Sequence, residues 1–484
     1  MGAPLTIVDN NLHEVSVEGR AYIFHIPTTS LFERDSLTGD ILQALRDDAR
    51  HSRASLTQAL TDRYTQRDIE RALGELQSLA LIANNGERAP AEAGLELKSF
   101  PLTSVVLNVN TGCNLSCTYC YKEDLEKPGA GKKMSFETAR DAMEMLLKES
   151  PDQPRYNVVF FGGEPLSNLP LIKQVVTYAE QRFAGLGRTV DFSLTTNATL
   201  LNEKTVDYLN DHNIGIAVSI DGPPAYHDRN RITVGGRGTY DLVAEKVKLL
   251  KARYSARPVG ARVTLTRGIT DIEAIWDHLF NTLGFHEVGF APVTAGDVAS
   301  YNLSGDELAT VFANMKRLGE KYLEAALDNR SIGFSNMHQL LTDIHEGTRK
   351  VLPCGAGVGM VAVDHAGGID LCHRFSGSDM PHFGEVNKGL DKTGLNQFLN
   401  QRLEQRNLGC NSCRIRNLCA GGCYHESYAR YNDPLKPTWH YCELLRDWVD
   451  FGIYTYTQIL AKNPGFFARY LSPRRAHYET SQSA

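Results

Sequence analysis

Three cysteines occur within eight residues in the stretch "NTGCNLSCTYCYKE", which runs from Asn110 to Glu123. They are Cys113, Cys117 and Cys120, separated by three and then two residues. Thiolates are soft ligands that suit iron–sulfur clusters and zinc. Three thiolates from one loop can hold three irons of a 4Fe–4S cube and leave the fourth iron open for a reaction. The triplet alone also fits a zinc loop or a chance spacing.

The other seven of the ten cysteines crowd the last third of the 484-residue chain: Cys354, Cys372, Cys410, Cys413, Cys419, Cys423 and Cys442. No secretory signal is visible at the N-terminus, so we expect a cytoplasmic protein with reduced thiols. We therefore interpret these cysteines as metal ligands or catalytic groups and not as disulfides. CxxC pairs in general also occur in zinc ribbons.

Composition excludes two classes of partner. The net charge of −6 argues against a general nucleic-acid binder, which needs basic surface to neutralise phosphates. No apolar stretch is long enough to span a bilayer, so we expect no membrane partner.

The elements that must position the cysteines alternate through the middle of the chain. Six apolar runs predict strands at Ser104–Val109, Asn157–Phe161, Asp191–Thr195, Ile214–Ile220, Ala261–Thr266 and Glu287–Pro292. Helical patterns follow at Ser135–Lys148, Leu169–Phe183, Glu203–His212, Tyr240–Arg253, Asp271–Leu283 and Ser304–Ala326. This order predicts a parallel α/β sheet, either doubly wound or a partial barrel, with functional groups at the carboxyl ends of the strands.

Polar motifs stand at those strand ends. "FFGGEP" ends the second strand, "SLTTNAT" the third, "VSIDG" the fourth and "GFAPV" the sixth, and "YHDRNR" follows the fourth. Each motif alone fits a tight turn or a buried strand with a polar end. The residues of these motifs, together with one arginine on the fifth strand, are candidate ligand contacts. They are Gly162, Gly163, Glu164, Thr196, Asn197, Ser219, Asp221 and Arg262.

Taken together, the cysteine loop and these motifs resemble the radical S-adenosylmethionine (SAM) superfamily. Its signature is CxxxCxxC with an aromatic residue before the last cysteine, here Tyr119. The resemblance implies a partial (β/α)6 barrel whose 4Fe–4S cluster binds SAM and cleaves it to a 5′-deoxyadenosyl radical. It also implies that Glu164 meets the SAM ammonium, Ser219 the ribose and Arg262 the carboxylate. "GFAPV" would pack on the adenine.

The later cysteines resemble the SPASM pattern, which in related enzymes holds two auxiliary 4Fe–4S clusters. The resemblance assigns the distal cluster to Cys410, Cys413, Cys419 and Cys442. It leaves the nearer cluster with Cys354, Cys372 and Cys423, and therefore with a non-cysteine ligand or an open iron. We hypothesise that a substrate thiolate binds that open iron.

The region from Val15 to Asn84 predicts a strand followed by small amphipathic helices, a winged-helix-like unit. It resembles the peptide-recognition element of SPASM maturases, which adds a peptide strand to a sheet edge; a DNA-binding helix-turn-helix is the alternative. We predict a peptide-recognition domain over 1–98 that binds a Cys-containing substrate peptide or small subunit. A radical SAM partial barrel over 99–345, a SPASM domain over 346–450, and a helix and tail over 451–484 follow.

Two segments, "YIFHIPTTSLFERDSLTGDIL" and "CGAGVGMVAVDHAGGIDLCHRFSG", resemble the thioether-forming maturases, among them those of quinohemoprotein amine dehydrogenase. The resemblance implies bonds from Cys sulfur to Asp or Glu methylene carbons, with electrons from a flavodoxin or ferredoxin. SCIFF-type maturases, formylglycine-forming sulfatase maturases and a zinc-stabilised scaffold remain alternatives. Where SCIFF maturases have an aromatic residue, this chain has Asp370, either a base or thiol-positioning group or a solvated turn carboxylate.

Overall fold

Residues 3–84, 102–121, 131–294 and 300–471 are described by a computed structural model. Its centre is an eight-stranded sheet in the order β11-β10-β9-β8-β7-β6-β12-β13. Six of these strands are parallel to one another and follow chain order: β6 (Ser104–Asn110), β7 (Arg155–Gly162), β8 (Thr189–Thr196), β9 (Gly215–Ser219), β10 (Gly260–Leu265) and β11 (Glu287–Pro292). The predicted α/β fold with a partial barrel is confirmed, and the doubly wound alternative is excluded by this strand order.

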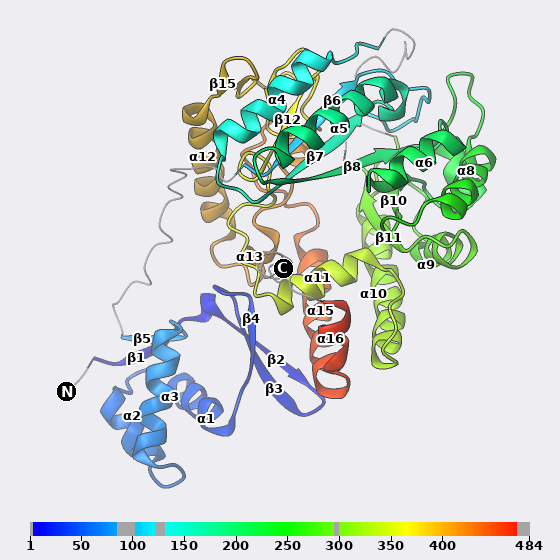
Figure 1. Ribbon diagram of the computed structural model, residues 1–484. Coiled ribbons are helices and arrows are strands. Elements are labelled where there is room, and N and C mark those ends of the chain that lie inside the picture. Colours follow the sequence, from blue (N-terminus) through cyan, green and yellow to red (C-terminus); the bar gives the residue numbers. More distant parts are fainter. Residues whose placement is uncertain (1–2, 85–101, 122–130, 295–299, 472–484) are drawn as a thin grey trace.

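Helices connect these strands on the outer face of the sheet (Figure 1). They are α4 (Phe136–Glu149), α5 (Leu169–Ala184), α6 (Glu203–Asp211), α7 (Pro224–Asn230), α8 (Tyr240–Arg253) and α9 (Ile272–Asp277). The hydroxyl of Ser135 caps α4 by accepting from the backbone N–H of Thr138, as expected for serine at a helix start. The helix predicted over 271–283 divides into α9 and a π-helical turn at His278–Thr282.

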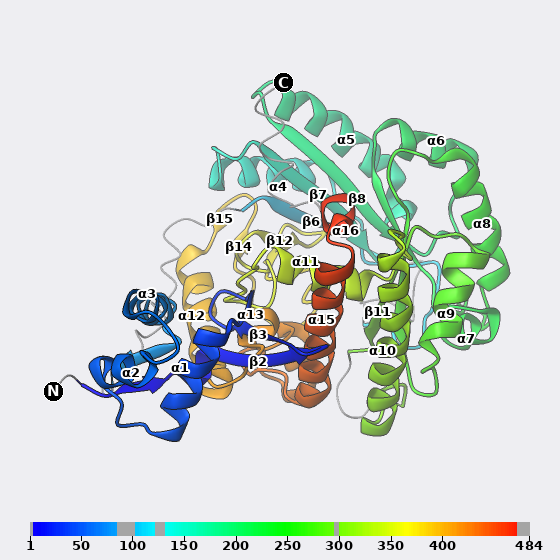
Figure 2. The same cartoon turned by 90° about the horizontal axis from the view of Figure 1, so that it is seen from below.

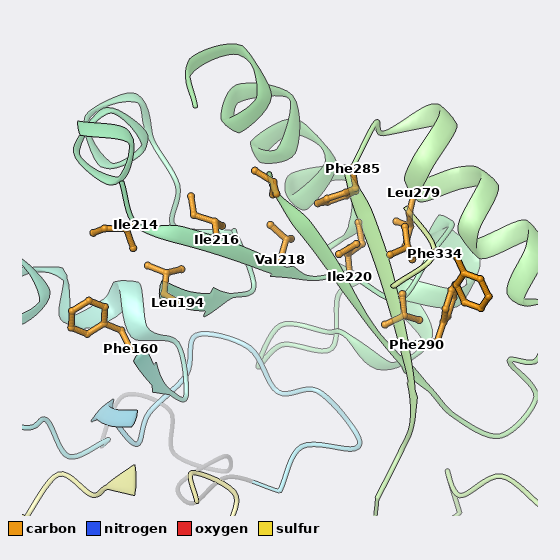
Figure 3. Packing of buried hydrophobic residues seen from close by; sticks show 14 of the residues in the cluster. Phe160, Leu194, Ile214, Ile216, Val218, Ile220, Leu279, Phe285, Phe290 and Phe334 are labelled. Carbon is orange, nitrogen blue, oxygen red and sulfur yellow. The ribbon is translucent and has the colours of Figure 1, made fainter. Parts of the chain in front are cut away.

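The barrel core lies between these helices and the sheet. Figure 3 shows Phe160, Leu194, Ile216 and Val218 packed on neighbouring strands, and each is at most 4% exposed. Burying one such side chain contributes about 1.5–3 kcal/mol. This packing fixes the strand ends that carry the predicted motifs.

The C-terminal third extends the barrel sheet. Strand β12 (Met360–Val363) pairs in parallel with β6, and β13 (Ile369–Asp370) pairs antiparallel with β12. Beyond them lie a short hairpin of β14 (Gly384–Glu385) and β15 (Gly389–Leu390), and four helices: α12 (Lys392–Cys410), α13 (Arg416–Cys419), α14 (Tyr424–Tyr431) and α15 (Cys442–Lys462). A separate apolar cluster around Leu371, Leu395 and Leu399 supports this region.

The sequence pattern did not reveal α12, because two of its buried positions are arginines. Arg402 is 0% exposed and Arg406 is 1% exposed. Arg402 donates to the carbonyl oxygens of Gly421 and Gly422, at 2.6 and 3.0 Å, and to that of Lys436. These bonds stabilise the buried guanidinium on a face that otherwise buries Leu395, Phe398, Leu399 and Leu403.

The N-terminal region has its own sheet and its own core. Strands β2 (Leu12–Val17), β3 (Arg20–His25) and β4 (Ser30–Glu33) form an antiparallel sheet in that order, and β1 (Leu5–Ile7) pairs with β5 (Ile82–Asn84). Three helices follow the sheet: α1 (Ser36–Asp47), α2 (Arg53–Leu60) and α3 (Gln66–Ser78). The segment at 84–100 is polar and contains glycine and proline, which predicts a linker, and it lies outside the described residues after Asn84.

The N-terminal sheet lies against the C-terminal helices in both views of the chain (Figures 1 and 2). The side-chain amide of Asn417 donates to the carbonyl oxygens of Ile26 and Pro27, and His13 lies 3.0 Å from a carboxylate oxygen of Asp450. Helices α10 (Gly305–Leu327), α11 (Ser335–His345) and α16 (Gly465–Tyr470) complete the described chain. None of its described helices is long and apolar enough to cross a membrane.

Candidate active site

A cavity of about 800 Å³ lies at the carboxyl ends of the barrel strands. Its wall contains the three cysteines of the first loop and the ends of β7 to β11, and it also includes residues from α11 and from the loop after β13. Of the predicted contacts, those that line it are Tyr119, Gly162, Gly163, Glu164, Thr196, Asn197, Ser219 and Arg262. The strand ends therefore meet at one site, as the parallel order of the sheet predicts.

Two glycines allow the second strand to approach the cysteine loop. A Cβ on Gly162 would lie 2.2 Å from the carbonyl oxygen of Asn110, and one on Gly163 would lie 2.1 Å from that of Gly112. Gly162 also has a φ of +142°, which side chains disfavour. Glycine at both positions is needed to place the loop beside β7.

Glu164 joins the second and third strands. Its side chain accepts hydrogen bonds from the Thr196 hydroxyl at 2.7 Å and from the Asn197 backbone N–H at 2.8 Å. Burial raises the pKa of this carboxyl to about 7, although these hydrogen bonds act in the opposite direction. An ammonium ligand in the cavity would favour the charged form of Glu164.

The amide of Asn197 in turn contacts the cysteine loop. It donates to the side-chain oxygen of Asn114 at 3.0 Å and lies 3.7 Å from the sulfur of Cys113. The end of β8 therefore positions the first cysteine directly.

Asp221 is not among the residues that line the cavity, and its contact with a ligand remains a prediction. It is 0% exposed and accepts from the Tyr119 hydroxyl at 2.6 Å and from Nε of Arg231 at 3.0 Å. The backbone N–H of Thr264 donates to its second oxygen at 3.0 Å. Asp221 therefore positions Tyr119 and Arg231, which do line the cavity.

Ser219 and Arg262 form another part of the cavity wall. They are register partners on β9 and β10, so their side chains leave the sheet side by side. The Arg262 side chain is 56% exposed, and its guanidinium lies 3.9 Å from Glu287. The exposed guanidinium of Arg262 could bind an anionic group of a ligand. The contacts of Ser219 with the SAM ribose and of Arg262 with the SAM carboxylate remain predictions.

The ten thiols influence one another in three sets. Burial, with smaller contributions from Cys117 and Cys120, raises the pKa of Cys113 to about 12. Burial raises the pKa of Cys372 to about 12, with Cys423 and Cys354 adding to the shift. For Cys419, burial and its neighbours Cys442, Cys410 and Cys413 raise the pKa to about 11.

The thiols near one another in these three sets are those assigned to the three clusters, and their roles as cluster ligands remain predictions. A buried thiol with a raised pKa becomes a thiolate when a metal supplies the compensating charge, so the donor sets fit iron–sulfur groups. In the described residues, no three His, Cys, Asp or Glu side chains converge where a single ion would sit.

Asp370 is also placed away from the cavity wall. Its side chain is 2% exposed and accepts from the Ser376 hydroxyl at 2.5 Å. Its other carboxylate oxygen lies 2.8 Å from Nδ1 of His382. Burial raises the pKa of this carboxyl, which is therefore not a solvated turn carboxylate. Its role as a base or thiol-positioning group remains a prediction.

Sequence reasoning missed several residues of the cavity wall: Tyr121, Asn336, His373, Arg374 and Trp448. Tyr121 follows Cys120, and His373 and Arg374 follow Cys372, so adjacency to a predicted cysteine ligand was the available signal. Asn336 and Trp448 belong to helices far along the chain, and the sequence gives no signal for them.

Comparison with known proteins finds similarity that is concentrated in the central domain. Residues 107–279 match the family model of the radical SAM superfamily. An uncharacterized protein of Methanocaldococcus jannaschii is 35% identical over 118 residues, 24% of this chain and 38% of that protein. A serine-type anaerobic sulfatase-maturating enzyme of Bacteroides thetaiotaomicron is 29% identical over 200 residues, 40% of this chain and 46% of that enzyme. The chain thus matches less than half the length of either relative.

The solved structure titled "Native anSMEcpe with bound AdoMet" has the same fold. It superposes with a TM-score of 0.64 at 20% identity and covers 75% of this chain and 100% of that one. It shows that this chain shares the α/β partial-barrel fold of that protein.

Proposed function

We propose that this chain, whose residues 107–279 form a radical SAM domain, modifies a Cys-containing peptide or small protein subunit by forming intra-peptide thioether bonds. The bonds would join Cys sulfur to a side-chain methylene carbon of Asp or Glu. One observation carries the proposal: the cavity wall includes both the three-cysteine loop and residues that directly follow Cys372 of the second cysteine set. A substrate in this cavity would lie between the two cysteine sets.

Cys113, Cys117 and Cys120 would hold the SAM-binding cluster, which supplies radical abstraction of hydrogen from an unactivated carbon. Around it, Glu164 and Asn197 would orient the ligand's amino end, and Arg262 would face its carboxylate. Cavity walls from three parts of the chain would keep water away from the reacting carbon. The protein's contribution is therefore position and shielding.

Cys354, Cys372 and Cys423 would hold the nearer auxiliary cluster, and Cys410, Cys413, Cys419 and Cys442 the distal one. We propose that the position left free in the three-cysteine set receives the substrate thiol. This would place the sulfur beside the carbon that loses hydrogen. An external donor such as flavodoxin or ferredoxin would supply the electron that starts the reaction in the cytoplasm. The thiol would lose its proton, and the electron left over when the C–S bond forms would leave through the auxiliary clusters.

The substrate's leader would bind the N-terminal sheet. Among the described residues, β4 pairs with β3 on one side only, so its other edge offers unpaired backbone groups. Phe32 on β4 is 41% exposed and would pack against the added strand. Peptide addition to a sheet edge combines backbone hydrogen bonds with such side-chain contacts.

A sulfatase-type oxidation of Cys or Ser to formylglycine is the second candidate. The relative named as a sulfatase-maturating enzyme supports it as strongly as any comparison supports thioether formation. That reaction does not need a leader-binding domain, which favours the thioether reading for this chain.

Mass spectrometry separates the two reactions. The chain is reconstituted anaerobically, mixed with SAM, a reductant and candidate Cys-containing peptides, and the products are analysed after alkylation of free thiols. Each thioether lowers the peptide mass by about 2 Da and removes one alkylatable thiol, since one C–H and one S–H hydrogen are lost. Formylglycine from Cys would lower the mass by about 18 Da and leave an aldehyde. Observation of the aldehyde would end the thioether proposal.

A further inference from the structure

Arg374 lies in the wall of the active-site cavity, in the loop that follows Cys372. Its Nη1 donates a hydrogen bond to the Thr294 hydroxyl, and its guanidinium carbon lies 5.4 Å from the centre of the Tyr121 ring. Thr294 and Tyr121 line the same cavity. Since Tyr121 follows Cys120, these contacts place the guanidinium between the first cysteine loop and the second cysteine set.

The cavity's other arginines already have carboxylate neighbours. Arg231 is 3.0 Å from buried Asp221, and Arg262 is 3.9 Å from Glu287. Arg374 forms no ion pair with any carboxylate in the described chain, and it contacts a hydroxyl and a ring. Its side chain is partly buried, and a cation removed from water without a counter-charge is costly.

A guanidinium in such a place is best satisfied by a carboxylate, because its paired N–H groups match two carboxylate oxygens. Two sources of a carboxylate would enter this cavity: SAM and the peptide. Arg262 is on β10 beside Ser219 of β9, where the SAM carboxylate is predicted to bind. Arg374 stands beside Cys372, where the peptide thiol is proposed to bind.

We propose that Arg374 is a specificity-determining residue that binds the carboxylate of an Asp or Glu side chain in the peptide substrate. This inference rests on the proposed peptide-modifying function and deepens it. Anchoring the carboxylate fixes the neighbouring methylene carbon in the cavity next to the thiol. An amide side chain of the same shape would lack the charge that the guanidinium requires.

The test uses four synthetic peptides, Gly-Ser-Cys-Gly-Xaa-Gly-Ser, in which Xaa is Glu, Gln, Asp or Asn. Their binding to the cluster-loaded, SAM-bound full chain is measured anaerobically by calorimetry. The wild type should bind the acidic peptides about tenfold to a hundredfold more tightly than their amides, the range expected for one charge-assisted hydrogen-bonded pair. Arg374→Gln should bring that ratio to about one, and Arg374→Lys should keep part of it.

Arg330→Gln is the matched control. This arginine is exposed, pairs with Asp328 at 3.0 Å on the surface and should leave the ratio unchanged. SAM affinity is measured for every variant. If Arg374→Gln weakens only SAM binding, Arg374 belongs to the SAM carboxylate. If it changes only the cluster's electron paramagnetic resonance spectrum, it acts on the group at Cys372. Either result overturns the proposal, as does a wild type that does not distinguish acid from amide or binds neither.

The peptide products separate this outcome from a failure of the proposed function. Thioether formation in peptides with and without the acidic residue would retain that function and reject the role of Arg374. A loaded enzyme that cleaves SAM but modifies no Cys-containing peptide would reject the function itself.

Discussion

The Tyr119 hydroxyl donates a 2.6 Å hydrogen bond to Asp221, a residue 102 positions further along the chain. Because Asp221 also pairs with Arg231 and is fully buried, this contact joins the cysteine loop to the loop after β9. The cavity wall therefore depends on a buried charge that does not itself line the cavity.

Removing that charge should destabilise the chain more than removing the hydroxyl. Asp221→Ala leaves Arg231 buried and unpaired, and we expect a loss of about 3–5 kcal/mol in unfolding free energy. Tyr119→Phe removes one hydrogen bond to a charged group and should cost about 1.5–3 kcal/mol. Chemical denaturation of both variants measures the difference. Equal losses would mean that Asp221 does not act through Arg231.

A methyl group at Gly163 should displace the cysteine loop. Its Cβ would lie 2.1 Å from the carbonyl oxygen of Gly112, so backbone atoms must move. We expect Gly163→Ala to fold but to lose about four irons per chain and SAM binding, measured by iron analysis and calorimetry. Gly305→Ala is the matched control, since no atom lies within 4 Å of the Cβ it would gain. Full iron content in Gly163→Ala would contradict the prediction.

Glu164 should make stability depend on pH. Its folded-state pKa is raised from 4.5 to about 7, so the folded chain binds a proton that the unfolded chain has released between these values. The stability that this proton contributes is fully present below the unfolded pKa and is lost as pH rises through about 7. Unfolding of the metal-free chain between about pH 4 and pH 8 should show this loss, and Glu164→Gln should reduce it. An identical pH profile in the variant would argue against the raised pKa.

The three cysteine sets should load iron independently. Three clusters predict about eleven to twelve irons per chain with matching acid-labile sulfide. Replacing Cys413 by Ala should remove about four irons and leave the signal of the SAM-binding cluster, because Cys413 interacts with Cys419 and Cys442 and not with the first loop. Stoichiometric zinc in place of iron would contradict this prediction and would support the alternative of a zinc-stabilised scaffold.

The sequence was most informative where apolar runs alternate with helical patterns. All six barrel strands lie within three residues of their predicted bounds, since buried parallel strands and amphipathic helices leave strong periodic signals. Helix α12 was missed because Arg402 and Arg406 occupy its buried face.

Some residues of the candidate site could be predicted from the sequence and others could not. Residues at strand ends were found from their motifs. Asp221 and Asp370 are buried behind the cavity wall, and the sequence alone does not distinguish a carboxylate behind the wall from one that faces the cavity. Asn336 and Trp448 reach the cavity only through tertiary packing. Arg374 could be recognised only from the partners that surround its side chain.

Strand β12 hydrogen-bonds to β6, the strand that leads directly into the first cysteine loop. The separation between the first and second cysteine sets is therefore set by backbone pairing within one continuous sheet, and not by a hinge. Electron tunnelling between groups held by these sets would proceed over a constant length through the catalytic cycle. A barrel fragment that ends before residue 360 would lack β12 and would expose the unpaired backbone N–H and C=O groups at the edge of β6. Because such an edge can pair with another chain, the two cysteine-bearing regions are expected to aggregate if they are expressed apart.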